Sequence, residues 1–89
     1  MVNVFLTHEV KDFSSWKTGF DADEERRSQA GIKIDGVYTS VENPNLVTIV
    51  TEFPNEEVVK GFLQSPELKS KMEEVGVIGA PEVRILKKF

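Results

Sequence analysis

Hydrophobic and polar positions alternate along four stretches of the chain, the period expected of strands whose side chains point to opposite faces of a sheet. These stretches are residues 2–10, 32–41, 46–53 and 82–89. The two middle stretches are rich in β-branched residues and are joined by Glu42-Asn43-Pro44-Asn45, a sequence typical of a tight turn. They therefore predict a hairpin, and Gly36 can introduce a bulge into its first strand. A loop is expected over residues 77–81, before the last strand.

The apolar positions between the first two strands follow the helical period instead. Asp12 is suited to cap the start of a helix over residues 12–30, and Gly31 is suited to end it. One apolar stripe is expected along this helix, formed by Phe13, Trp16 and Phe20 and continued by Arg27.

Two shorter helical segments are predicted between the third and fourth strands. Asn55 is an N-cap residue for the first, and Ser65 followed by Pro66 is a typical start for the second. The apolar stripe of the second segment consists of Leu68, Met72 and Val75, and Gly76 is suited to end it.

The order strand, helix, strand, strand, helix, strand is the split βαβ plan of ferredoxin-like α+β domains. Right-handed crossovers place the first strand between the third and the fourth, so the four-stranded sheet is antiparallel with its helices on one face. We therefore expect residues 1–89 to form a single ferredoxin-like domain.

The face of the sheet without helices should be polar in a monomer, but neither predicted face is. The third strand has apolar side chains on both sides: Val47, Ile49 and Phe53 on one, Leu46 and Val50 on the other. An apolar second face of this kind usually marks an interface, so the pattern favours a homodimer packed sheet to sheet. The alternative is a monomer with a few exposed valines.

Composition narrows the function classes. The chain of 89 residues has no cysteine and one histidine, so disulfides, thiolate metal sites and a multi-histidine zinc site within one chain are excluded. The formal net charge of −4 argues against a nucleic-acid partner, and no apolar run is long enough to span a membrane. No signal peptide is recognised, and the lack of cysteine fits a reducing compartment, so a cytoplasmic location is expected.

The sequence resembles the small dimeric α/β-barrel proteins of the antibiotic-biosynthesis-monooxygenase-like superfamily. The similarity is carried by HEVKDFSSWK at residues 8–17 with Phe20-Asp21 behind it, and by Ser65-Pro66-Glu67-Leu68, Met72 and residues 76–81. It is greatest to short bacterial members that are labelled cyclase or left uncharacterised. The resemblance implies a dimeric barrel and a cofactor-independent oxygenase, cyclase or isomerase. The Asn, Trp and His pattern of haem-degrading members is not matched, so no cofactor is expected. No metal is expected either, because Asp21 with Glu24 or Glu25 on one helix face offers too few ligands.

The predicted topology brings several candidate residues to one end of the sheet. His8 is the only side chain whose usual pKa suits proton transfer near neutrality, so it is the candidate acid/base. The candidate substrate-binding residues are Trp16, Tyr38, Met72, Gly76 and Gly79. Arg27 and Glu52 are expected at the opposite end, as a structural ion pair.

Each candidate also has a purely structural interpretation. His8 at the end of a strand can bond to Asp12 or a backbone carbonyl, and Trp16 can be ordinary core. Both glycines can serve only to stop a helix and form a loop, and the direction of Tyr38 depends on the bulge at Gly36. The sequence thus leaves two functions open: an enzyme acting on a planar or aromatic substrate, or a non-catalytic module that binds a ligand or only dimerises.

Overall fold

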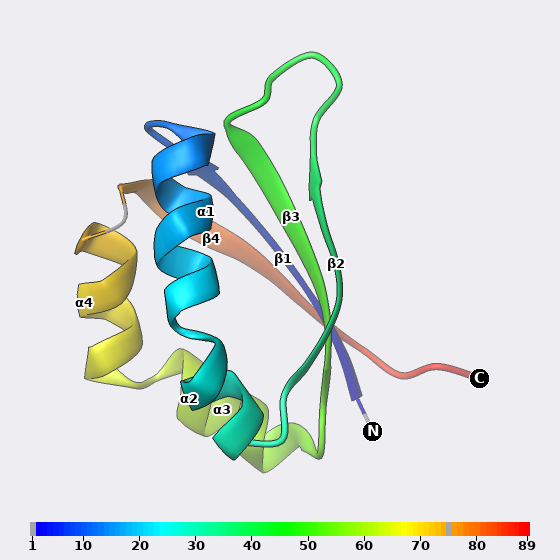
Figure 1. The fold of residues 1–89 in the computed structure, drawn as a ribbon. Coiled ribbons are helices and arrows are strands. Elements are labelled where there is room, and N and C mark those ends of the chain that lie inside the picture. The colour runs from blue at the N-terminus through cyan, green and yellow to red at the C-terminus, as the bar shows by residue number, and fades with distance from the viewer. Residues whose placement is uncertain (1, 75) are drawn as a thin grey trace.

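The computed structural model describes residues 2–74 and 76–89, without the side chains of Glu67, Leu68, Lys71 and Ala80. Within these residues lies a four-stranded antiparallel sheet with the order β2-β3-β1-β4 (Figure 1). Its strands are β1 (Val2–Val10), β2 (Lys33–Thr39), β3 (Leu46–Phe53) and β4 (Val77–Leu86). The predicted α+β class and the position of the first strand between the third and fourth are confirmed.

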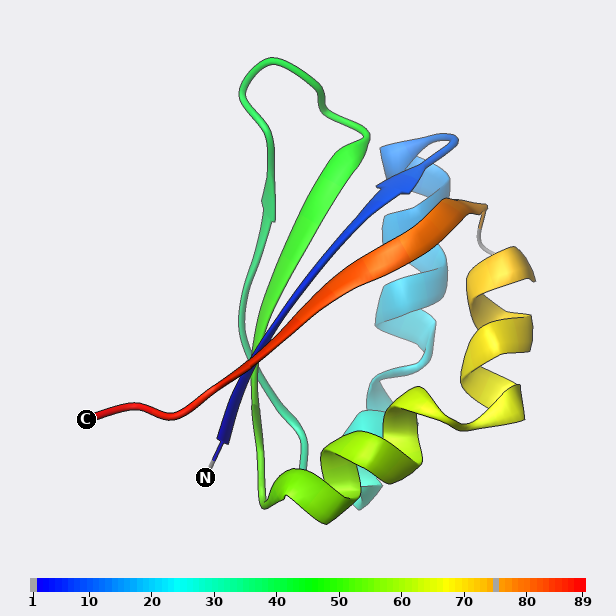
Figure 2. The same cartoon turned by 180° about the vertical axis from the view of Figure 1, so that it is seen from behind.

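Four helices lie on one face of this sheet, as the views from the two sides show (Figures 1 and 2). They are α1 (Phe13–Ala22), α2 (Glu24–Gln29), α3 (Glu56–Leu63) and α4 (Pro66–Glu74). Among the described residues, none of these helices is both long and apolar enough to cross a membrane. We refer to the sheet face under the helices as the inner face and to the opposite face as the outer face.

Local hydrogen bonds explain where α1 and α3 begin. The carboxylate of Asp12 accepts from the N–H of Ser15 at 2.9 Å, and Asn55 caps α3 through the N–H of Val58. The side-chain oxygen of Asn45, in the turn between β2 and β3, accepts from the N–H of Phe13 at 3.0 Å. This bond attaches the hairpin turn to the start of α1, as the predicted topology requires.

The single helix expected over residues 12–30 is interrupted at Asp23. The N–H of Asp23 bonds to the carbonyl of Phe20 at 3.2 Å, a tight turn that ends α1 at Ala22, and α2 begins at Glu24. Asp23 itself has φ −95° and ψ 10°, outside the helical region. Gly31, with φ +76°, ends the segment as predicted.

The last strand differs from its prediction. It begins at Val77 rather than at residue 82, so the expected loop over residues 77–81 is part of β4. Thr7 pairs with Glu82 and Glu9 with Ile78, so more residues lie on β4 than on β1 between these pairs. The extra residues form a bulge, which lets glycine and proline be accommodated within a strand.

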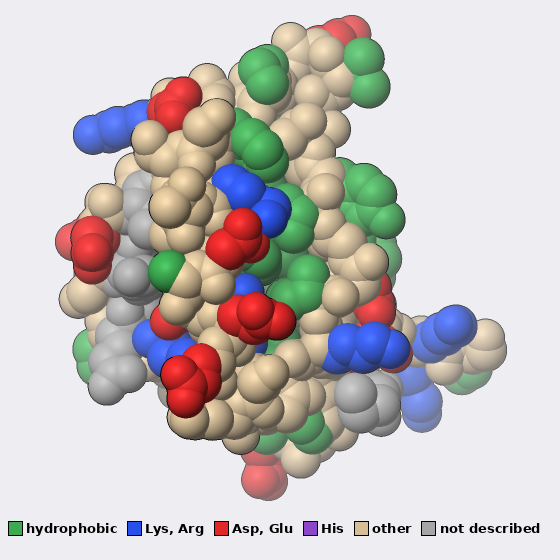
Figure 3. Space-filling view, viewed as in Figure 1, with side chains coloured by type: hydrophobic (Ala, Val, Ile, Leu, Met, Phe, Trp, Pro, Cys, Tyr) green, Lys and Arg blue, Asp and Glu red, His purple; other side chains and the backbone are tan. Residues whose placement is uncertain are grey.

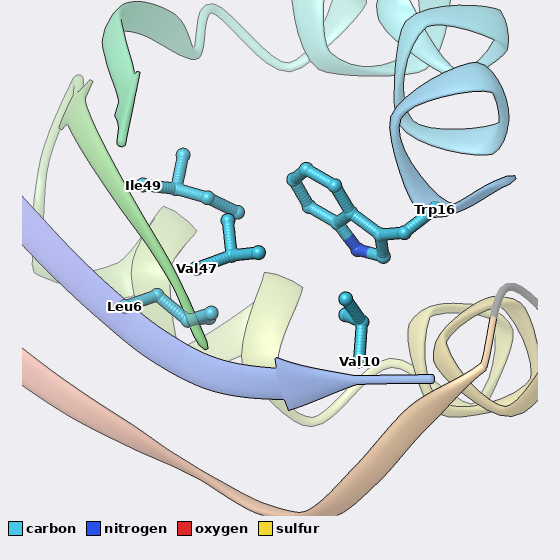
Figure 4. Close-up of a cluster of buried hydrophobic side chains, with 5 residues drawn as sticks. All are labelled: Leu6, Val10, Trp16, Val47 and Ile49. Carbon is cyan, nitrogen blue, oxygen red and sulfur yellow. The ribbon is translucent and has the colours of Figure 1, made fainter. Parts of the chain in front are cut away.

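The core fills the space between the inner face and the helices. Trp16 points from α1 to the sheet and packs on Leu6, Val10, Val47 and Ile49 (Figure 4). A second cluster consists of Val4, Ile32, Phe53 and Val59. Of the stripe predicted on α4, Met72 packs against the first cluster, while the side chain of Leu68 and residue Val75 lie outside the described part.

Candidate functional site

A cavity of about 90 Å³ lies between the inner face and the helices. Its walls are almost entirely apolar, and polar side chains enter them at only a few positions among the described residues. The apolar part includes Val4, Leu6, Trp16, Phe20, Ile32, Ile34, Ile49, Phe53, Phe62, Leu63 and Met72, and the polar part includes His8, Asp23, Arg27 and Thr51.

His8 is the polar side chain at the end of the cavity near the start of α1. It is 5% exposed, and neither ring nitrogen has a hydrogen-bond partner. Its ring meets Trp16 edge to face, with centroids 5.4 Å apart. The alternative in which His8 bonds to Asp12 or to a backbone carbonyl is wrong, because neither ring nitrogen has a hydrogen-bond partner. His8 is thus buried with its nitrogens free.

Burial changes the protonation of this imidazole. Desolvation disfavours the charged form and lowers the pKa of His8 from 6.5 to about 4. At neutral pH the ring is therefore neutral, with one nitrogen able to accept a hydrogen bond and the other able to donate one.

Arg27 from α2 is the second unusual polar residue in the wall. It is 7% exposed, and its Nη1 donates to the carbonyl of Phe20 at 2.8 Å, while Nε has no partner. Its guanidinium lies 3.9 Å from the centroid of the Phe20 ring. Burial lowers the pKa of Arg27 and the nearby Asp23 opposes this, but an arginine side chain stays charged in proteins.

Thr51 is a buried polar residue of the cavity wall whose hydroxyl does have a hydrogen-bond partner. Its hydroxyl donates to the carbonyl of Val4 at 2.9 Å. A buried polar atom left without such a bond costs roughly 1–3 kcal/mol. The free nitrogens of His8 and Arg27 are therefore features that need a reason.

Aromatic contacts through Trp16 and Phe20 connect His8 to Arg27. Trp16 stacks on Phe20 with centroids 4.9 Å apart and planes inclined by 23°. His8 contacts Trp16 at one end of this pair, and Arg27 covers Phe20 at the other. We call His8, Trp16, Phe20 and Arg27 the aromatic column, because each member contacts the next.

A second, more open space adjoins the cavity. It is a groove of about 420 Å³ between α1, α2 and β2, and it shares Phe20, Arg27, Ile32 and Ile34 with the cavity wall. On the face seen in Figure 3 hydrophobic side chains lie deep in a hollow between the helices and β2, with charged side chains at its rim. The charged lining residues besides Arg27 are Lys17, Asp21, Glu24 and Lys33.

The structure brings together three of the six residues predicted for the site. His8, Trp16 and Met72 line the cavity, whereas Tyr38, Gly76 and Gly79 are not among its lining residues. Gly76 follows α4 and has φ +85°, and its carbonyl accepts a hydrogen bond from the N–H of Lys11. Gly79, with φ +71°, lies in the bulge of β4.

Tyr38 lies on the outer face and is 58% exposed. The predicted bulge at Gly36 explains this, because the register shifts between Ile34 and Gly36. As a result Ile34 and Val37 both pack against the core, and Tyr38 points the other way. Its ring lies over Gly36, where an added Cβ would come within 2.6 Å of it.

Arg27 is the site residue that sequence reasoning missed. The predicted ion pair with Glu52 is wrong, because Arg27 donates to the carbonyl of Phe20 and has its Nε free, while Glu52 lies 3.8 Å from Nζ of Lys33. The signal was present in the sequence, since Arg27 continues an otherwise aromatic stripe. Among the described residues, no group of three or more His, Asp or Glu side chains is placed to hold a metal ion.

Comparison with known proteins supports the fold. No protein-family model and no curated protein matches the sequence. One similar structure is that of a protein from Bordetella bronchiseptica to which the name antibiotic biosynthesis monooxygenase has been assigned. It superposes with a TM-score of 0.77 at 18% sequence identity, over 99% of this chain and 96% of that one. A conserved protein from Methanosarcina mazei Go1 gives a TM-score of 0.75 at 20% identity over 99% and 92%.

A third solved structure, of an antibiotic biosynthesis monooxygenase, gives a TM-score of 0.76 at 10% identity over 100% of this chain and 99% of that one. These matches extend over almost the whole of each chain, so the likeness is one of complete folds. The chain thus has the fold of the antibiotic-biosynthesis-monooxygenase-like proteins, as the resemblance implied. At such low identity the likeness concerns the fold alone.

Proposed function

We propose that this protein binds a planar or aromatic small molecule in the cavity and transfers a proton with His8, as a cofactor-independent oxygenase, cyclase or isomerase. The observation that carries the proposal is the imidazole of His8, buried with both nitrogens free in an apolar wall. A ligand that bonds to these nitrogens would recover the free energy that burial costs.

Proton transfer is the step that these three reaction types have in common. One nitrogen of the neutral imidazole takes a proton from a C–H or O–H group of the substrate, and the electron pair of that bond stays on the substrate as an enolate or phenolate. With a pKa of about 4, the imidazole of His8 is by itself a weak base. The anion formed beside it raises that pKa, because an opposite charge favours imidazolium.

The shape of the site supports a flat ligand. Trp16 and Phe20 of α1 form one wall of the cavity and side chains of β1 and β3 form another, so the space lies between two layers. A cavity of about 150 Å³ holds benzene, so about 90 Å³ is too small for a larger ring system. Together with the adjoining groove, the space reaches the roughly 300–1,000 Å³ usual for ligand pockets.

Turnover of 9-anthrone tests the enzymatic proposal. In deuterated buffer without oxygen, the wild-type protein should accelerate exchange of the C10 hydrogens, followed by proton NMR, and in air it should accelerate quinone formation. His8→Gln should reduce both rates by about 10²-fold or more, the usual contribution of a general base. Tyr38→Phe, on the outer face, is the matched control and should retain the wild-type rates.

A non-catalytic ligand-binding module is the second candidate, and the low pKa of His8 favours it. In that case the indole N–H resonance of Trp16, the one tryptophan in the chain, should shift on addition of anthrone while exchange proceeds at the rate of buffer. Equal rates for wild-type protein and His8→Gln would overturn the acid/base role.

We also propose that the protein is a cytoplasmic homodimer that buries the outer face. Apolar residues surround the centre of that face and remain partly exposed in one chain: Phe5 (37%), Leu46 (36%), Tyr38 (58%), Ile78 (45%) and Leu86 (43%). A chain of this size buries little surface and gains stability from association. No cysteine is available to stabilise it by disulfides, and the same lack fits a reducing compartment.

Sedimentation equilibrium tests the dimer. The wild-type protein should sediment with twice the mass of one chain at micromolar concentration. Phe5→Lys, which replaces one of these apolar side chains by a charge, should sediment as one chain, whereas Lys60→Met on α3 should not change the mass. A single-chain mass for the wild-type protein at high concentration would overturn the dimer.

A further inference from the structure

Arg27 has more hydrogen-bonding capacity than the protein uses. A guanidinium carries five N–H donors, and in this buried residue one donor group is satisfied by the Phe20 carbonyl while Nε is left free. Asp23 and Glu24 lie close enough to favour its charge. Asp23, however, forms its ion pair with Arg26, with Nε and the carboxylate oxygen 3.7 Å apart.

The position of Arg27 makes this spare capacity informative. It lines both the apolar cavity and the more polar groove, so its guanidinium lies where the two spaces meet. Phe20 covers one face of the guanidinium and excludes water from it. A buried cation in such a place is stabilised by an anionic partner that arrives with a ligand.

We propose that Arg27 anchors the carboxylate of a planar aromatic acid, whose apolar body lies along Phe20 and Trp16 in the space that the cavity and the groove form together. The inference rests on the proposed function, because it uses the same cavity and sets the direction of the ligand in it. The anionic end lies at Arg27, and the reacting end lies at His8, at the other end of the aromatic column.

Charge in the groove favours a singly charged head group. Lys17 and Lys33 accompany Arg27 there, but so do Asp21 and Glu24. Lys17 is already paired with Asp21 at 2.7 Å, and Lys33 lies 3.8 Å from Glu52. A dianion such as a phosphate monoester would be repelled by the two groove carboxylates, whereas a carboxylate matches the fork of one guanidinium.

Binding of 2-naphthoate and its neutral analogue 2-naphthamide tests the proposal. Both are titrated into the wild-type protein while the single indole N–H resonance, that of Trp16, is followed by NMR. A hydrogen bond between charged partners is worth at least about a factor of ten in affinity. We expect 2-naphthoate to bind at least tenfold more tightly than 2-naphthamide.

Variants then assign this preference to Arg27. Arg27→Met should remove the tenfold preference by weakening 2-naphthoate alone, with the affinity for 2-naphthamide unchanged within a factor of two. Lys60→Met removes the same charge from the surface of α3 and should retain the preference. Arg27→Lys keeps the charge without the fork, and an intermediate preference is expected.

The wild-type titrations decide the question even if the Arg27 variants do not fold. Equal affinity of the two compounds, each shifting the indole resonance, would overturn the carboxylate anchor and leave the proposed binding cavity intact. No shift with either compound at millimolar concentration would overturn both. An equal loss of both affinities in Arg27→Met would show that Arg27 acts only by supporting the wall.

Discussion

The two sides of the sheet differ in the polar atoms that they leave without a hydrogen-bond partner. On the inner face, the apolar cavity contains nitrogens of His8 and Arg27 that have no partner. On the outer face, the polar groups at the centre are paired: the hydroxyls of Thr7 and Thr48 lie 2.9 Å apart. The outer face instead leaves apolar side chains partly exposed around this pair.

This contrast distinguishes a surface suited to bind a small molecule from a surface suited to bind another protein. Unpaired polar atoms in a dry cavity are completed by a small molecule that brings hydrogen-bonding groups with it. Paired polar atoms surrounded by exposed apolar side chains are completed by another protein surface, which needs only to exclude water. The inner face is therefore the side on which chemistry is proposed, and the outer face the side on which association is proposed.

Truncation of aromatic residues should show the largest difference between the faces. Trp16→Ala removes a side chain that is 2% exposed and should lower the free energy of unfolding by about 3–5 kcal/mol. Tyr38→Ala on the outer face should cost about 1–2 kcal/mol, because its ring is 58% exposed within one chain and is covered only by the partner in the proposed dimer. Urea unfolding followed by circular dichroism, at one protein concentration, measures both. Similar losses would mean that the outer face is packed as tightly as the core.

Lowering the pH should destabilise the protein because His8 on the inner face is buried in its neutral form. The pKa of His8 is about 4 in the folded chain and 6.5 when solvated, so between these values the unfolded chain holds a proton that the folded chain does not. Stability from the neutral ring is thus complete above pH 6.5 and is lost as the pH falls towards 4. By pH 5 this loss amounts to about 2 kcal/mol.

Comparison with His8→Gln isolates the contribution of the histidine. Urea unfolding at pH 7 and pH 5 should show a fall in stability that is about 2 kcal/mol larger for the wild-type protein than for the variant. The carboxylates respond to acid in both proteins and cancel in this difference. An identical fall in the two proteins would mean that His8 is solvated.

The hydroxyls of Thr7 and Thr48 on the outer face should stabilise the protein as one hydrogen-bonded pair. Thr7→Val or Thr48→Val alone leaves one hydroxyl without its partner and should cost about 1 kcal/mol. The double variant removes both groups and should cost less than the sum of the single changes, because no hydroxyl is left unpaired. Additive losses from chemical denaturation would show that the hydroxyls are bonded to water instead.

The smallest effect is expected at the rim of the groove. Lys17 and Asp21 form an exposed ion pair on α1, which is worth about 0.3–0.5 kcal/mol. Lys17→Met should lower the free energy of unfolding by no more than this, and less in 1 M salt because of screening. A loss above about 1 kcal/mol that resists salt would mean that the rim is desolvated.

Local sequence patterns predicted much of the fold. The caps at Asp12 and Asn55, the turn at Asn43 and the stops at Gly31 and Gly76 each depend on residues within a few positions of one another. Alternation of apolar residues defined the first three strands closely. For the site, His8, Trp16 and Met72 followed from the strand and helix ends that the topology brings together.

Three features were decided only by the tertiary structure. The chain was expected to form one helix to residue 30, but the break at Asp23 divides it, and Arg27 reaches the cavity wall from α2. The bulge opposite residue 8 of β1 extends β4 back to Val77. The register shift at Gly36 directs Tyr38 to the outer face.

The physical reason is the range of the interactions involved. Caps, turns and periodicity are local, so the amino-acid sequence by itself determined the elements of this protein and their order. The direction of a side chain beyond a bulge or a helix break depends on contacts with distant parts of the chain. The free nitrogens of His8 and Arg27 depend on the residues that surround them in the fold, none of which supplies a hydrogen-bond partner. Only the assembled tertiary structure determines these features.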